Sequence, residues 1–145
     1  MVSVWRKQSI AVVELYGTIG GAVRPAIYLP ILERVRNSRR FRGLVIAIDS
    51  PGGSAAASEE LYRGISKIAS TKPVVAYIRE RGASGAYYIS CAAQKIVAVP
   101  NALVGSIGVI FARPTAEQLF QKVGLDFSIQ KSGKYKDMYG PWRKP

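Results

Sequence analysis

The apolar run at residues 43–49 (G-L-V-I-A-I-D) constrains the fold of this chain most strongly. It is short, nearly continuous and rich in β-branched residues, which is typical of a strand in a parallel sheet covered on both faces. Similar short runs occur at residues 9–16, 73–79 and 95–99. Segments with helical periodicity separate them, at residues 27–38 and 54–69. This alternation of strand and helix predicts an α/β fold with right-handed crossovers.

The C-terminal third of the chain has weaker patterns. We expect strand and loop in close approach at residues 104–111, a helix at 114–123 and a final strand at 125–130. The chain has 145 residues and 48% hydrophobic residues, which is enough for one domain with its own core.

A small-residue turn from Gly82 to Gly85 precedes an expected apolar helix at residues 84–93 and places Ser84 at its start. Backbone N–H groups at a helix start are unpaired and carry partial positive charge, so they suit an oxyanion. Ser84 is therefore a candidate nucleophile. A plain N-cap is the other interpretation, and the turn taken alone favours it.

The chain contains no histidine, so a Ser-His-Asp triad and a histidine metal site within this chain are excluded. A serine becomes a good nucleophile only when a neighbouring base takes its proton. The base must then be Lys, Asp, Glu or Tyr, and the serine–lysine pair is a known arrangement. The single Cys91 excludes an intrachain disulfide, and we expect it to be a small core residue.

The chain is strongly basic, with a formal net charge of +12, and its arginines cluster between Arg34 and Arg42. A basic surface favours anionic partners such as phospholipid headgroups. We expect mainly a solvated face, with peripheral association with an anionic membrane as the second interpretation. No nucleic-acid motif accompanies the charge, so we expect no nucleic-acid partner. Without a run of ~20 apolar residues or a signal-peptide pattern, a soluble, cytoplasmic location stays open.

A second glycine-rich turn, at residues 49–54 (D-S-P-G-G-S), follows the strand at 43–49. Parallel sheets usually place their sites at the carboxyl ends of strands, where both turns are expected. A carbonyl near Ser84 could be polarised by the N–H of Gly85 and by an N–H of Gly52 or Gly53. Glycine lets the backbone approach a substrate without a Cβ in the way. A simple turn is the alternative for this segment.

The order of the motifs resembles the signal peptide peptidase (SppA) family over almost the whole chain, from residue 10 to 137. The matching segments are D-S-P-G-G-S at 49–54 with A-S-E at 57–59, G-A-S-G-A-Y-Y-I at 82–89, G-S-I-G-V at 105–109 and S-G-K-Y-K-D at 132–137.

The resemblance implies one serine–lysine peptidase domain over residues 1–145. Its fold would be the Clp-protease/crotonase-like α/β fold, with repeated ββα units around a mostly parallel sheet. The resemblance implies Ser84 as nucleophile, Lys136 as general base, and Gly53 and Gly85 as oxyanion-hole donors. No cofactor or metal is implied.

The same resemblance implies an acyl-enzyme mechanism that degrades extended apolar peptides, such as the remnants of cleaved signal peptides. It implies a homo-oligomer in which neighbouring subunits share the dyad, and it implies membrane association. A membrane-associated serine protease of the stomatin-partner type is one alternative. A catalytically impaired homologue that acts as a binding module is another.

Lys136 would need an unusual environment to act as a base. A lysine is almost wholly protonated at neutral pH, and desolvation must lower its pKa to roughly 7–8 for base catalysis. Ser106 is our candidate for orienting the lysine amine. Lys134 would share a face with Lys136 in an extended segment, so spacing alone does not separate them. Only the resemblance selects Lys136.

The chain departs from the family pattern at particular places. Ala86 stands where family members often have glycine, and we expect this chain to lack the family's usual N-terminal membrane anchor. The sequence ends nine residues after Lys136, whereas family members continue with further helices. We therefore expect a domain that is truncated at its C-terminal end.

Overall fold

The computed structural model describes residues 9–110, 112, 114–134 and 140–141. The chain divides into two compact units, one that ends at Val109 and one that begins at Ile110.

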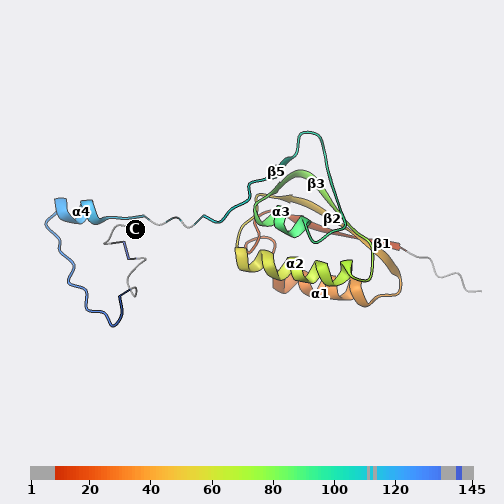
Figure 1. The fold of residues 1–145 in the computed structure, drawn as a ribbon, viewed down its shortest axis with the longest axis horizontal. Helices are drawn as coiled ribbons and strands as arrows, with labels where there is room; N and C mark the ends of the chain where they lie inside the picture. Colours follow the sequence, from red (N-terminus) through yellow and green to blue (C-terminus); the bar gives the residue numbers. More distant parts are fainter. Residues whose placement is uncertain (1–8, 111, 113, 135–139, 142–145) are drawn as a thin grey trace, which may run out of the picture. The chain divides into compact units, whose positions relative to one another are not determined.

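The first unit is built on a five-stranded sheet (Figure 1). Its main strands lie in the order β1, β2, β3, β4, and the short β5 pairs with the end of β3. Every one of these pairs is parallel, which confirms the α/β fold with a parallel sheet. The strands are β1 (Ser9–Tyr16), β2 (Phe41–Ser50), β3 (Val74–Ala83), β4 (Lys95–Ala98) and β5 (Leu103–Gly105).

Helices α1 (Pro25–Asn37) and α2 (Ala55–Ala69) lie side by side on one face of this sheet (Figure 1). The strands point buried side chains toward them in register, for example Val13 beside Ile46 and Ile46 beside Ala76. The other face is partly open to solvent, with Val12 of the outer strand 62% exposed. The expectation of a sheet covered on both faces is therefore wrong, because both crossover helices pack on the same side.

Strand β3 and helix α3 meet more abruptly than the sequence predicts. β3 continues through Gly82 and Ala83, and α3 is a short helix of six residues, Gly85–Ser90. Gly82 pairs with Ser50 of β2 and with Val104 of β5, so these partners extend the strand into the expected turn. Ser84 alone connects the strand to the helix.

The second unit contains helix α4 (Glu117–Lys122), which is shorter than the predicted helix at 114–123. Phe120 of α4 contacts Phe127 edge to face, with ring centroids 4.6 Å apart. Residues 125–130 form no strand, so that prediction is wrong. The alternating apolar pattern there is suitable for a strand, but a strand also needs a partner for its backbone groups, and the described residues supply none.

The N-terminus of α2 supports a stability prediction, because the hydroxyl of Ser54 accepts a hydrogen bond of 3.3 Å from the N–H of Ala57. We expect Ser54→Ala to lower the free energy of unfolding by about 1 kcal/mol. Chemical denaturation measures this change. The matched control is Ser66→Ala in the same helix, which should be neutral or slightly stabilising because alanine favours helices. Equal losses in both variants would contradict the capping role.

Candidate active site

Ser84 has an unusual backbone conformation, with φ of 52° and ψ of −122°. Its N–H donates to the carbonyl of Gly105 at 2.7 Å, and its carbonyl accepts from the N–H of Tyr88 at 3.0 Å. Its hydroxyl makes no capping hydrogen bond to α3. The N-cap interpretation, which the turn alone favours, is therefore wrong. The hydroxyl is left available for other chemistry.

A positive φ is costly for a residue with a side chain, and such residues cluster at functional sites. Among the non-glycine residues that the structure describes, only Ser84 and Ser106 have one. The two are neighbours through Gly105, whose carbonyl holds the N–H of Ser84. The hydrogen bonds on both sides of Ser84 thus fix a strained turn that presents its side chain.

Two backbone loops approach each other closely at this turn. A Cβ added to Gly52 would lie 2.7 Å from the carbonyl oxygen of Ala83 and 2.8 Å from the Cβ of Ser84. No real side chain tolerates such distances, so only glycine permits this contact. Gly52 also has a φ of 93°, which disfavours other residues independently.

The backbones of Gly53 and Gly85 lie close together beside this turn. Gly85 is the first residue of α3, so its N–H has no acceptor within the helix. A Cβ on Gly85 would lie 3.7 Å from the nitrogen of Gly53, which shows how near the two residues are. Because α3 is only six residues long, the individual N–H groups matter here more than a helix dipole.

The hydrogen bonds between Ile19 and the loop at Gly53 use the residues on either side of Gly53 and not the N–H of Gly53 itself. Ile19 donates to the carbonyl of Gly52 and accepts from the N–H of Ser54, both at 2.9 Å. Neither Gly53 nor Gly85 donates its N–H in the loop hydrogen bonds found between described residues. The site therefore offers two adjacent backbone donors beside one hydroxyl, which is suitable for polarising a carbonyl.

Two buried serine hydroxyls form hydrogen bonds that hold these loops in place. Ser50 accepts a hydrogen bond of 3.1 Å from the N–H of Gly52. Ser58 donates to the carbonyl of Ser54 at 2.8 Å, and its side chain occupies the place that a Cβ on Gly85 would need. Both side chains have their hydroxyls satisfied, so their role is structural. The sequence did not single out either serine for this role.

The structure brings together some of the predicted site residues. Ser84, Gly53, Gly85 and the segment at Ser106 lie within the first unit. Lys136 lies outside the described residues. Lys134 belongs to the second unit, where its side chain is exposed and its carbonyl accepts from Lys131 at 3.4 Å.

Cys91 is exposed, so the expectation of a core position is wrong. The reason is that Cys91 follows the exposed Tyr88 by three residues, so it lies on the side of α3 away from the buried Ala86 and Ile89. Among the described residues, no group of three or more His, Cys, Asp and Glu side chains is placed to hold a metal ion.

A polar cluster joins α2 to α3 and was not predicted. The hydroxyl of Tyr88 donates to the carboxylate of Glu59 at 2.5 Å, and Arg63 donates to the other carboxylate oxygen at 2.5 Å. Tyr88 also stacks on Tyr62, with ring centroids 4.6 Å apart. The Glu59–Arg63 pair has helical i, i+4 spacing and was readable from the sequence, whereas the contact to Tyr88 spans 29 positions.

This cluster changes the ionisation of its members. The hydrogen bond from Tyr88, and then that from Arg63, lowers the pKa of Glu59. The same bond to Glu59 raises the pKa of Tyr88. The cluster therefore ties the helix that begins at Gly85 to the helix that follows Gly53, and it does so most strongly while Glu59 is ionised.

The parallel sheet, and the serine on a strained turn from strand to helix, define an α/β protein of the Clp-protease/crotonase-like class. Solved structures agree with the fold. The 1510-N membrane-bound stomatin-specific protease, solved with a substrate peptide, has a TM-score of 0.58 at 24% identity, over 77% of this chain and 50% of that one. ClpP1 from Listeria monocytogenes has a TM-score of 0.50 at 25% identity, over 63% of this chain and 52% of that one.

Sequence comparison then gives the family. Residues 66–144 match the sequence model of peptidase family S49, and the chain belongs to that family. The chloroplastic serine protease SPPA of Arabidopsis thaliana is 40% identical over 128 residues, which cover 88% of this chain. The matched region is 19% of that relative's length, so this chain corresponds to a small part of it.

Within the described residues, no helix is both long and apolar enough to cross a membrane.

The strain at Ser84 gives a prediction about the stability of two variants. Glycine adopts a φ of 52° with ψ of −122° more readily than serine or alanine does. We expect Ser84→Gly to raise the free energy of unfolding by about 1 kcal/mol over Ser84→Ala, which keeps the strain. Thermal or chemical denaturation of the two variants measures the difference. A Ser84→Gly variant less stable than Ser84→Ala would contradict a strained turn.

The Glu59–Tyr88 bond gives a pH prediction. Because folding lowers the pKa of Glu59, its contribution to stability is present above the unfolded-state pKa and is lost as the pH falls through the folded-state value. We expect Tyr88→Phe to be less stable than the parent at neutral pH, with the difference shrinking in acid. Denaturation across pH measures this, with Tyr87→Phe as the control. A difference that does not change with pH would contradict the role of the ionised carboxylate.

Proposed function

We propose that this chain carries the catalytic machinery of a serine peptidase that works through a Ser84–Lys136 dyad. The observation that carries the proposal is the uncommitted hydroxyl of Ser84 on its strained turn, beside the N–H groups of Gly53 and Gly85. Membership of a peptidase family agrees with this chemistry.

The reaction follows from these groups. The Ser84 oxygen attacks the carbonyl carbon of a peptide bond while the neutral amine of Lys136 takes the serine proton. The carbonyl oxygen becomes an oxyanion, and the N–H groups of Gly53 and Gly85 donate to it. Lys136 returns the proton to the leaving amine, and an acyl-enzyme ester remains. Water that loses a proton to Lys136 then attacks the ester carbonyl, and Lys136 returns that proton to the Ser84 oxygen as the acyl group leaves.

The choice of Lys136 as base depends on the family motif. The segment S-G-K-Y-K-D contains both Lys134 and Lys136, and only the second matches the family's base. For Lys136 to be neutral near pH 7, it must be desolvated in the working enzyme. We propose Ser106 as the hydroxyl that orients its amine, because Ser106 follows the residue that holds the backbone of Ser84.

In this proposal residues 1–145 act as one peptidase domain. We further propose that subunits assemble and that a neighbouring copy completes the dyad. Exposed apolar side chains support assembly, since such groups usually mark contact surfaces. They include Ile107, Val109 and Ile110 beside the site segment and Leu119, Val123 and Leu125 in the second unit.

The substrates in this proposal are extended, largely apolar peptides, of which signal-peptide remnants are one source. An extended peptide can add as a strand beside an exposed sheet edge, where backbone hydrogen bonds hold it in register. β5 is short and exposed, and it pairs with β3 at the residues directly before Ser84. A peptide bound along this edge would pass the nucleophile.

Substitution of the dyad tests the proposal. We expect Ser84→Ala and Lys136→Ala each to lower kcat for hydrolysis of an apolar peptide by at least about 10³-fold, because each removes a member of a unit that acts together. Lys134→Ala is the matched control and should retain activity. Full activity in Lys136→Ala, or equal losses in the two lysine variants, would contradict the assignment of the base.

A further inference from the structure

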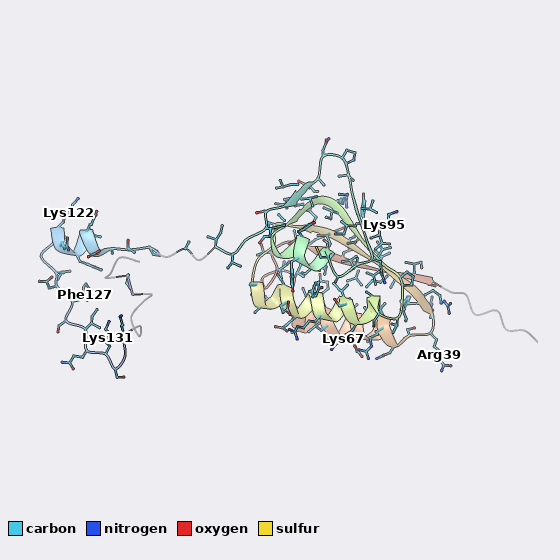
Figure 2. All side chains as sticks on the ribbon, viewed as in Figure 1. Arg39, Lys67, Lys95, Lys122, Phe127 and Lys131 are labelled. Atoms are coloured by element: carbon cyan, nitrogen blue, oxygen red, sulfur yellow. The ribbon has the colours of Figure 1, made fainter. Side chains whose placement is uncertain are left out.

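Basic side chains gather in the first unit at the end of the sheet where the strands begin, and Figure 2 labels Arg39, Lys67 and Lys95 among them. We call this surface the basic edge. Glu33 is the acidic residue within it. The basic edge consists of Arg34, Arg36, Arg39, Arg40, Arg42, Lys67, Lys72 and Lys95.

The opposite end of the same unit has mixed charge. Asp49 and Arg81 lie at the carboxyl ends of β2 and β3 and form an ion pair of 3.1 Å. Glu59 and Arg63 pair near the start of α2. The positive charge of the unit is therefore concentrated away from the candidate active site, at the other end of the strands.

The fold itself explains part of the basic edge. Arg34, Arg36 and Lys67 lie in the last turns of α1 and α2, where a positive charge complements the helix dipole. The ammonium group of Lys72 donates to the carbonyls of Val35 at 2.6 Å and Ser38 at 2.7 Å. These residues have a structural role at the ends of the helices.

The remaining basic residues have no such role. Arg39, Arg40, Arg42 and Lys95 are exposed, and none forms an ion pair with any acidic residue that the structure describes. Like charges that are close together repel one another and lower the stability of the folded state. An anionic partner would remove that repulsion.

We propose that the basic edge binds the surface of an anionic phospholipid membrane. Exposed aliphatic side chains adjoin it on the outer strand β1, where Ile10 is 56% exposed and pairs in register with Gly43, next to Arg42. Cationic groups beside aliphatic ones suit the headgroup and upper acyl region of a bilayer. Single-stranded nucleic acid would instead favour exposed aromatic rings for stacking. The aromatic residue at this edge, Phe41, packs against the core.

The geometry gives this binding a consequence for the site. Arg42 lies at the start of β2, and Asp49 lies near its end beside the glycine loop. A strand rises about 3.3 Å per residue, so the loop stands roughly 25 Å from the basic edge. A unit that rests on lipid through the basic edge would hold Ser84 above the surface and leave it open to peptides.

Vesicle binding by the full chain tests the proposal. The probes are vesicles of phosphatidylcholine with phosphatidylglycerol, and of phosphatidylcholine alone, at physiological ionic strength. We expect binding only to the anionic vesicles. The variant Arg39→Gln/Arg40→Gln/Arg42→Gln should bind about 100-fold more weakly, because each arginine near an anionic surface contributes about fivefold. Circular dichroism verifies that the variant is folded.

The matched control, Arg24→Gln/Arg79→Gln/Lys122→Gln, removes the same charge outside the basic edge and should bind within about threefold of the parent. Ser84→Ala should bind like the parent, because lipid binding does not depend on catalysis. Unchanged binding by the basic-edge variant, or an equal loss in the control, would overturn the proposal. Tighter binding to single-stranded DNA or RNA than to anionic vesicles would also overturn it, in favour of nucleic acid.

Discussion

The close approach of two backbone loops is the constraint on which the rest of this structure depends. Gly52 lies against the backbone of Ala83 and Ser84 at distances that exclude any side chain. The loops reach this position because Ser50 and Gly82 are paired across β2 and β3. A shift of one residue in that register would turn the side chains to the other face and separate the loops.

The core maintains the register, and the site uses the rigidity that results. Ile46, Ile48 and Ile78 are fully buried between the sheet and its helices. Strain at a single serine of about 1–3 kcal/mol is tolerable only when such packing over-determines the backbone. The buried hydroxyls of Ser50 and Ser58 then satisfy the polar groups that the loops leave underneath. The candidate active site thus lies at one end of the sheet, on loops that the core holds in place.

The sequence predicts the elements with strong local patterns. The β-branched run at residues 43–49 lies in β2, and the segment with helical periodicity at 54–69 corresponds to α2. Local patterns fail where tertiary partners decide. Gly82 looks like a turn residue but is held in β3 by two neighbouring strands. Residues 125–130 have a strand pattern but lack a partner, so they form no strand.

The sequence likewise predicts one part of the candidate site and not the other. The sequence identifies Ser84 and the two glycine turns, because small residues after predicted strands are a local signal. It does not identify the free hydroxyl, which depends on a φ of 52° enforced by Gly105. Nor does it identify the contact between Glu59 and Tyr88, which joins two helices far apart in the chain. The cluster of arginines at 34–42 is visible in the sequence, but its place at the same end of the sheet as Lys67, Lys72 and Lys95 follows only from the fold.

The formation of an acyl adduct at Ser84, followed by mass spectrometry across pH, tests the central claim most directly. The account predicts that an acylating probe directed at serine labels Ser84. It also predicts a labelling rate that rises with pH as the lysine base loses its proton, and that Lys136→Ala removes this rise. An unlabelled Ser84, or a pH profile that is the same without Lys136, would contradict the account.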